Sequence, residues 1–215
     1  GRCQRPRPPN GPGLTTSRRT FVKGALALAA LPGCPSGDGT LSAKATKLVE
    51  WATKDFGPGP VLDAHVHIVG MGTGKSGCWV NPRMQDGLAH PKHWARFQIY
   101  QAAAGVRNLD NADQEYVAVL ARLLNSMPFT TQALAFAFDF VHGEDGKPRR
   151  DISEFYTPNR HVLDIAQTHP NISAVASVHP YRPDAVEALH AAAEGGAVAV
   201  KWLPNAHRID QPDSR

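Results

Sequence analysis

Four short apolar runs alternate with amphipathic segments between residues 61 and 203, and this alternation limits the folds open to the chain. The predicted strands are 61–69, 132–141, 172–179 and 198–203, and the predicted helices are 41–56, 92–104, 113–127, 159–168 and 183–194. Helices placed between successive strands predict a parallel sheet of right-handed βαβ units. The predicted fold class is therefore α/β.

The side chains of the predicted strand 132–141 divide by size between its two faces. One face carries Leu134, Phe136, Phe138 and Phe140, and the other carries Ala133, Ala135, Ala137 and Asp139. Small residues fit the inside of a tightly curved sheet, so we expect the alanine face inside and the phenylalanine face against outer helices. This division favours a (β/α)8 TIM barrel, with a doubly wound open sheet as the alternative.

Polar side chains are expected at the carboxyl ends of these strands, where the active sites of barrels lie. They are His65 and His67, Asp139, His179 and Lys201. His65 and His67 are two residues apart on a strand, so their side chains share a face. Two neutral imidazoles on a rigid strand can bind one metal ion, and Asp63 on the same face could orient a ligand. The alternative is a core strand that happens to carry two histidines.

The N-terminal segment is typical of an export signal. Ser17-Arg18-Arg19-Thr20-Phe21-Val22-Lys23 closely resembles the twin-arginine motif of bacterial Tat substrates, and a short apolar run follows over residues 24–31. We expect a disordered start and Tat signal peptide over 1–34, a linker and amphipathic helix over 35–60, and the barrel segment over 61–215. The expected location is the periplasm or beyond, with the Tat machinery as a partner.

Leu31-Pro32-Gly33-Cys34 partly resembles a lipobox, in which Cys34 would be acylated. Cleavage nearby without a lipid is the alternative. Membrane contact is therefore expected only through the signal peptide or a lipid on Cys34.

The net positive charge of the chain comes from its N-terminal segment. The net charge is +4, but six basic residues precede the first acidic residue, Asp38. The remainder is slightly acidic, so we expect no nucleic-acid partner.

The other cysteine and histidines form no metal-binding pattern in the sequence. Cys78 is the one cysteine beyond the N-terminal segment, so we expect no disulfide framework in the domain. Solvated or helix-end positions are expected for His90, His93, His142, His161, His169, His190 and His207. The glycine-containing loop 70–87 is expected to form a flexible rim of the active site.

Val61-Leu62-Asp63-Ala64-His65-Val66-His67 resembles the first barrel strand of the amidohydrolase superfamily. With Phe138-Asp139-Phe140, Val178-His179-Pro180 and Val200-Lys201-Trp202-Leu203-Pro204-Asn205, it is most similar to the amidohydrolase-related (amidohydrolase 2) branch. The resemblance implies a divalent metal, most often zinc, bound by His65 and His67. In some branches a carboxylated lysine on the fourth strand bridges two metals, and Lys201 would match it. Binding of a substrate carboxylate and a solvated rim position are the alternatives for Lys201.

The resemblance covers roughly residues 61–210, which is about the first four of eight βα units. Further ligands and the general base of the family lie on later strands, so we expect an N-terminal half that is inactive alone. His179 is a further candidate ligand, and Asp139 is a candidate catalytic residue that could bind substrate or orient a ligand.

The implied activity is metal-dependent hydrolysis of an amide, ester or lactone in a small-molecule substrate, through a metal-activated water. A metal-dependent decarboxylase of the same superfamily is one alternative. An exported, non-catalytic binding protein on the same barrel is the other.

Overall fold

The computed structural model describes residues 40–56 and 59–209. The expected export signal and Cys34 lie outside these residues. Helix α2 (Ala43–Thr53) begins where the Ser42 side chain accepts a hydrogen bond from the Ala45 amide. It matches the helix predicted over 41–56, yet none of its residues is buried, and Trp51 is 71% exposed. In the described part of the chain, no helix has the length and apolar character needed to cross a membrane.

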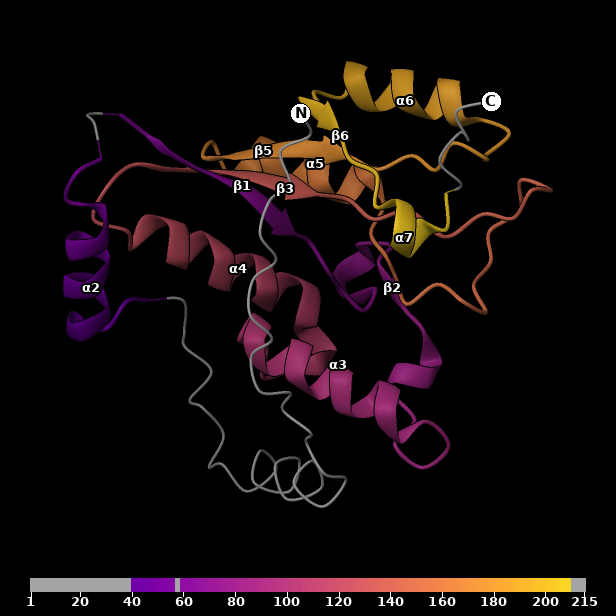
Figure 1. Ribbon diagram of the computed structural model, residues 1–215, viewed down its shortest axis with the longest axis horizontal. Coiled ribbons are helices and arrows are strands. Elements are labelled where there is room, and N and C mark those ends of the chain that lie inside the picture. Colours follow the sequence, from indigo (N-terminus) through magenta and orange to yellow (C-terminus); the bar gives the residue numbers. More distant parts are fainter. Residues whose placement is uncertain (1–39, 57–58, 210–215) are drawn as a thin grey trace, which may run out of the picture. The chain divides into compact units, whose positions relative to one another are not determined.

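A curled sheet of four parallel strands forms the centre of the fold, as predicted for an α/β chain (Figure 1). The strands β1 (Val61–His67), β3 (Thr131–Phe136), β5 (Ile172–Ala176) and β6 (Ala199–Val200) follow one another across the sheet. Each observed strand starts within one residue of its predicted start and ends earlier than predicted. The last residues of the predicted strands therefore belong to the loops that follow the carboxyl ends of the observed strands.

The helices between these strands lie where the sequence predicts them. They are α3 (Pro91–Ala104), α4 (Ala112–Asn125), α5 (Asn159–Thr168) and α6 (Ala185–Glu194). Six short elements are not predicted. They are an antiparallel pair of β2 (Trp79–Val80) with β4 (Phe155–Tyr156), helix α7 (Pro204–His207), and the 3-10 helices η1 (Thr73–Lys75), η2 (Pro82–Met84) and η3 (Leu109–Asn111). Elements of two to four residues are too short to leave a periodic pattern in the sequence.

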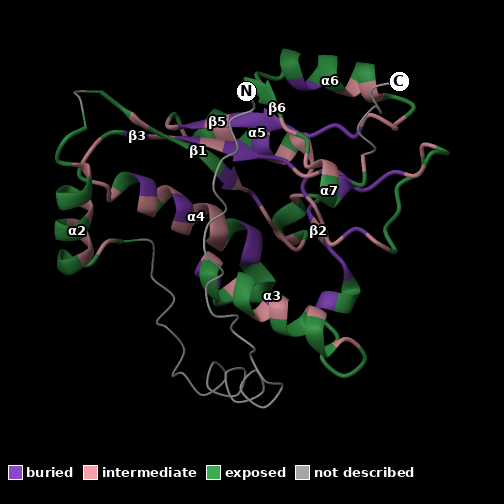
Figure 2. Ribbon diagram, in the orientation of Figure 1, coloured by how far each residue is buried: buried purple, intermediate pink, exposed green. Residues whose placement is uncertain are grey.

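The core lies between the sheet and helices α4 and α5. Ala133 and Ala135 of β3 are 1% and 0% exposed, and they cluster with Leu120 and Leu124 of α4 and Ile165 of α5. Figure 2 shows the buried residues concentrated along β3 and β5. The prediction that the alanine face lies inside a barrel is therefore wrong. The helices supply large aliphatic side chains, and small residues on the strand allow close packing against them.

Strand β1 contains an irregularity that changes the direction of Asp63. Asp63 pairs with Ala133, but Val66 pairs with Ala135, so β1 has one extra residue in between. Such a bulge reverses the alternation of side chains. Asp63 thus lies on the face of the sheet that carries Ala133, whereas His67 lies on the face that carries Phe136. The expectation that Asp63 shares the face of His65 and His67 is wrong for this reason.

Candidate metal centre

The rings of His65 and His67 converge near the end of β1. Their Nε2 atoms are 2.9 Å apart, and the ring centroids are 4.9 Å apart. Two nitrogens bound to one ion at about 2.0–2.1 Å would lie about 2.9–3.4 Å apart at bond angles of about 90–109°. The separation therefore fits a shared metal ion. It also fits a hydrogen bond between one protonated and one unprotonated nitrogen.

Lys201 reaches this pair from the opposite edge of the sheet. Its Nζ atom lies 3.2 Å from both ring nitrogens of His65 and 4.3 Å from the centroid of the Phe136 ring. In a flat sheet, β1 and β6 would be about 14 Å apart, which is three strand spacings. A lysine side chain spans only about 6 Å. The contact therefore depends on the curl of the sheet, and the side chains meet over its concave face.

The surroundings of His67 favour the neutral imidazole. Burial lowers the pKa of His67 below 6.5, and the nearby charges of His65 and Lys201 lower it further. Phe136 and Phe138 contact the His67 ring at centroid distances of 5.6 and 6.2 Å. A neutral imidazole is the form that binds metal ions, so this environment suits a ligand.

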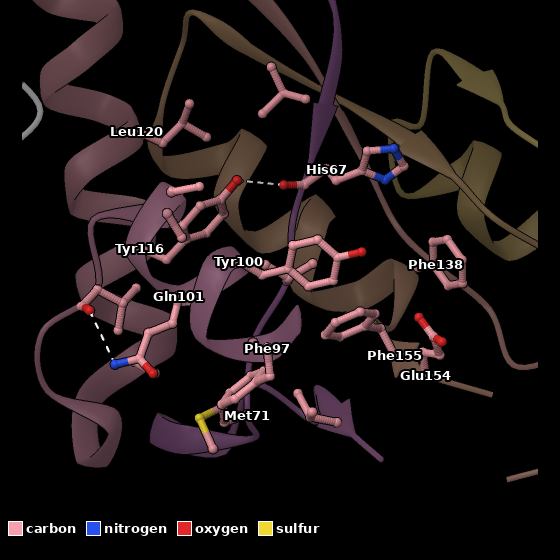
Figure 3. A pocket seen from close by; sticks show the side chains of 18 of the residues that line it. His67, Met71, Phe97, Tyr100, Gln101, Tyr116, Leu120, Phe138, Glu154 and Phe155 are labelled. Atoms are coloured by element: carbon pink, nitrogen blue, oxygen red, sulfur yellow. Dashed lines mark hydrogen bonds between the residues drawn. The ribbon is translucent and has the colours of Figure 1, made fainter. Parts of the chain in front are cut away.

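A largely apolar cavity of about 660 Å³ adjoins the two histidines. Its lining includes Phe97 and Tyr100 of α3, Tyr116 of α4, and Phe155 of β4. Figure 3 shows the His67 ring directed toward Phe138, while the Tyr116 hydroxyl donates to the backbone carbonyl of His67 at 2.6 Å. This volume is typical of a small-molecule site, and the lining would favour an apolar group of the ligand.

The structure places Asp139 and His179 in a second, buried polar cluster. The Asp139 carboxylate accepts hydrogen bonds from the amides of Phe140 and His179 and from Arg182 Nη1 at 3.1 Å. Nε2 of His179 donates to the backbone carbonyl of His207 at 2.9 Å. Through these bonds both residues stabilise the observed arrangement of the loops after β3 and β5. Their roles in catalysis and in metal binding stay predictions.

His142 and His207 belong to this same buried cluster. Their rings lie 5.1 and 5.8 Å from that of His179, and the two residues are 8% and 1% exposed. Phe138 lies between this cluster and the first one, since its ring is also 4.7 Å from that of His207. The expectation of a solvated or helix-end position is wrong for His142, which is buried outside any helix. His207 ends helix α7, as that expectation allows, but it is buried and not solvated. The loops after the strands and helix α7 fold over them, which local sequence patterns do not reveal.

A third cluster, of Cys78, Asp113 and His161, was not predicted. One ligand atom from each residue lies within 4.8 Å of the other two. The residues come from the loop before β2 and from the first turns of α4 and α5. Dozens of residues separate them along the chain, and no spacing motif connects them, so no sequence signal pointed to this group.

The loop after β1 is anchored by this cluster. The Asp113 carboxylate accepts hydrogen bonds from the Met71 amide at 2.6 Å, the Gly72 amide at 3.1 Å and the Thr73 hydroxyl at 3.0 Å. The Ser76 hydroxyl donates to the same carboxylate. A Cβ atom at position 70 would overlap this carboxylate, so glycine is required there. The loop predicted to be a flexible rim is thus tied to α4 along residues 71–76.

Comparisons of the chain with protein-family models, with curated proteins and with solved structures found no match. The residues described above are therefore the evidence for a function.

Proposed function

We propose that the chain carries the metal-binding half of a hydrolase of the amidohydrolase type, built on a (β/α)8 barrel. The observation that carries the proposal is the 2.9 Å separation of the His65 and His67 Nε2 atoms at the carboxyl end of a strand in a curled parallel sheet. Metal and substrate sites of such barrels lie at this end. The resemblance in the sequence supports the same assignment.

His65 and His67 would hold the ion, which we expect to be zinc because imidazole is a good ligand for it. A bound divalent ion would supply Lewis acidity toward a scissile carbonyl and would activate a water. Burial lowers the pKa of His67 and favours its neutral, ligating form. The apolar cavity would bind the non-reacting part of the substrate and exclude water from it.

Lys201 completes the group in this proposal. As a carboxylated side chain it would offer an oxygen ligand, whereas as an ammonium it would bind a substrate carboxylate. Its position beside His65 supports a role in the site and not a solvated rim position. Asp139 is proposed only to fix the segment after β3, through His179 and Arg182.

The test is metal content measured together with hydrolysis. The protein, loaded with zinc and desalted, should retain one equivalent of metal more than the His65→Ala/His67→Ala variant does. His190→Ala, which removes an exposed imidazole on α6, is the matched control and should retain it. A panel of aryl esters, lactones and anilides would then report the reaction. Release of carbon dioxide from aromatic carboxylic acids would instead assign the decarboxylase, and unchanged metal in the double variant would exclude the site.

A further inference from the structure

We infer that Cys78, Asp113 and His161 form a second metal site, distinct from His65 and His67, that takes a single zinc-like divalent ion and joins three segments of the fold. The first observation is the donor set. A thiol, a carboxylate and an imidazole, each offering one atom within 4.8 Å of the others, are the three ligand types that zinc accepts. This site is independent of the proposed hydrolase activity.

The second observation is one buried nitrogen of this group that has no hydrogen-bond partner. Among the described residues, Nε2 of His161 is buried and has no hydrogen-bond partner. A buried polar atom without a partner carries a desolvation cost, and an ion is one of the few groups that would remove it.

The third observation is the charge of the site. Asp113 is 1% exposed, and none of the ion pairs in the described part of the chain includes it. A divalent ion would balance this carboxylate and the thiolate of Cys78, with the thiol proton released to solvent. Thiolate, imidazole and carboxylate together favour zinc over magnesium or calcium.

The surrounding hydrogen bonds are those of an oriented ligand. Two backbone amides and the hydroxyls of Thr73 and Ser76 hold the Asp113 carboxylate, and Ser76 Oγ also accepts from the Cys78 amide at 3.1 Å. Such outer contacts fix ligand orientation in metal sites. Since Cys78 is 5% exposed, the ion would be largely shielded from solvent and would act as a structural link between the loop after β1, α4 and α5.

The test uses cobalt, because a thiolate bound to Co²⁺ gives a charge-transfer absorption that imidazole and carboxylate ligands do not give. The full chain carrying His65→Ala/His67→Ala, stripped of metal with a chelator and titrated with Co²⁺, should bind one equivalent and show this band. Because the variant lacks the first site, failure of the proposed function leaves this result unchanged. Absence of the band would overturn the inference.

Two further variants identify the ligands. Cys78→Ser on the same background should lose the band and the metal equivalent, whereas the Cys3→Ser/Cys34→Ser control should keep both. His161→Gln keeps the thiol, so it should still show the band. Its affinity should fall by at least the roughly 10–100-fold that loss of an outer partner of a ligand costs. A band that survives Cys78→Ser, or an unchanged affinity in His161→Gln, would show that the metal binds elsewhere. If Cys78→Ser fails to fold, the His161→Gln titration decides alone.

Discussion

His65 lies on one outer strand of the sheet and Lys201 directly follows the other, yet their side chains are 3.2 Å apart. Two inner strands separate β1 from β6, so the contact is possible only because the sheet curls and both side chains lean over its concave face. The same face carries Phe136, whose ring lies beneath the Lys201 ammonium and against His65 at 5.1 Å. The curl therefore creates the site by bringing residues from separate strands together.

Replacing Lys201 should weaken metal binding at His65 and His67 if the side chain is a carboxylated ligand. We expect Lys201→Ala and Lys201→Arg each to lower the zinc affinity by about 10-fold or more, because neither side chain can present a carboxylate oxygen. Competition with a chromophoric chelator, with and without added bicarbonate, would measure this. An affinity that rises in Lys201→Ala would indicate a repelling ammonium and would remove Lys201 from the ligand set.

Removing the charge of Asp139 should destabilise the fold. The carboxylate is 2% exposed and pairs with Arg182, so Asp139→Asn should lower the free energy of unfolding by about 2–4 kcal/mol. Asp184 pairs with the same guanidinium but is 58% exposed, so Asp184→Asn should cost less than about 1 kcal/mol. Urea denaturation of both variants is the measurement. An equal loss of unfolding free energy in the two variants would show that the burial of Asp139 does not determine how much it stabilises the fold.

Enlarging Ala135 should disturb the packing of β3 against the helices. Ala135→Leu places three extra carbons where no residue surface is exposed, and we expect a loss of about 1–3 kcal/mol in the free energy of unfolding. Gln132 lies on the opposite face of β3 and is partly exposed, so Gln132→Leu should change stability by less than about 0.5 kcal/mol. A neutral Ala135→Leu would mean that the alanine face does not pack against the helices.

Stability should fall as the pH is lowered, in part because of His207. Burial, followed by the neighbouring His179, lowers the pKa of His207 from 6.5 to about 4. Between these values the unfolded chain binds a proton that the folded chain does not, so acid favours unfolding. Through this group the free energy of unfolding falls by at most about 1.4 kcal/mol per pH unit. The fall is complete below about pH 4, where His207 is protonated in the folded chain as well.

The difference between His207→Gln and the unaltered protein isolates this contribution from those of other titrating groups. Unfolding free energies at about pH 7 and about pH 4.5 should differ less in the variant. His190→Gln, on the exposed surface of α6, should keep the full difference. A variant with an unchanged pH dependence would assign the effect to His179 instead, whose pKa burial also lowers.

The sequence by itself determined the order and type of the main elements and the convergence of His65 and His67. Both depend on local periodicity: apolar runs and helical spacing mark the strands and helices, and residues two apart on a strand share a face. Lys201 could also be placed at the carboxyl end of its strand in this way. Its contact with His65 could not, because it depends on the curl of the whole sheet.

Only the tertiary structure decided which face of β3 packs against helices, and it did so through the aliphatic side chains of α4 and α5. It also turned Asp63 away through one extra residue in β1, buried His207 beneath the ends of the strands, and brought Cys78, Asp113 and His161 together. Each of these outcomes depends on contacts between residues far apart in the chain. Such contacts follow from the packing of complete elements, for which a local sequence pattern holds no information.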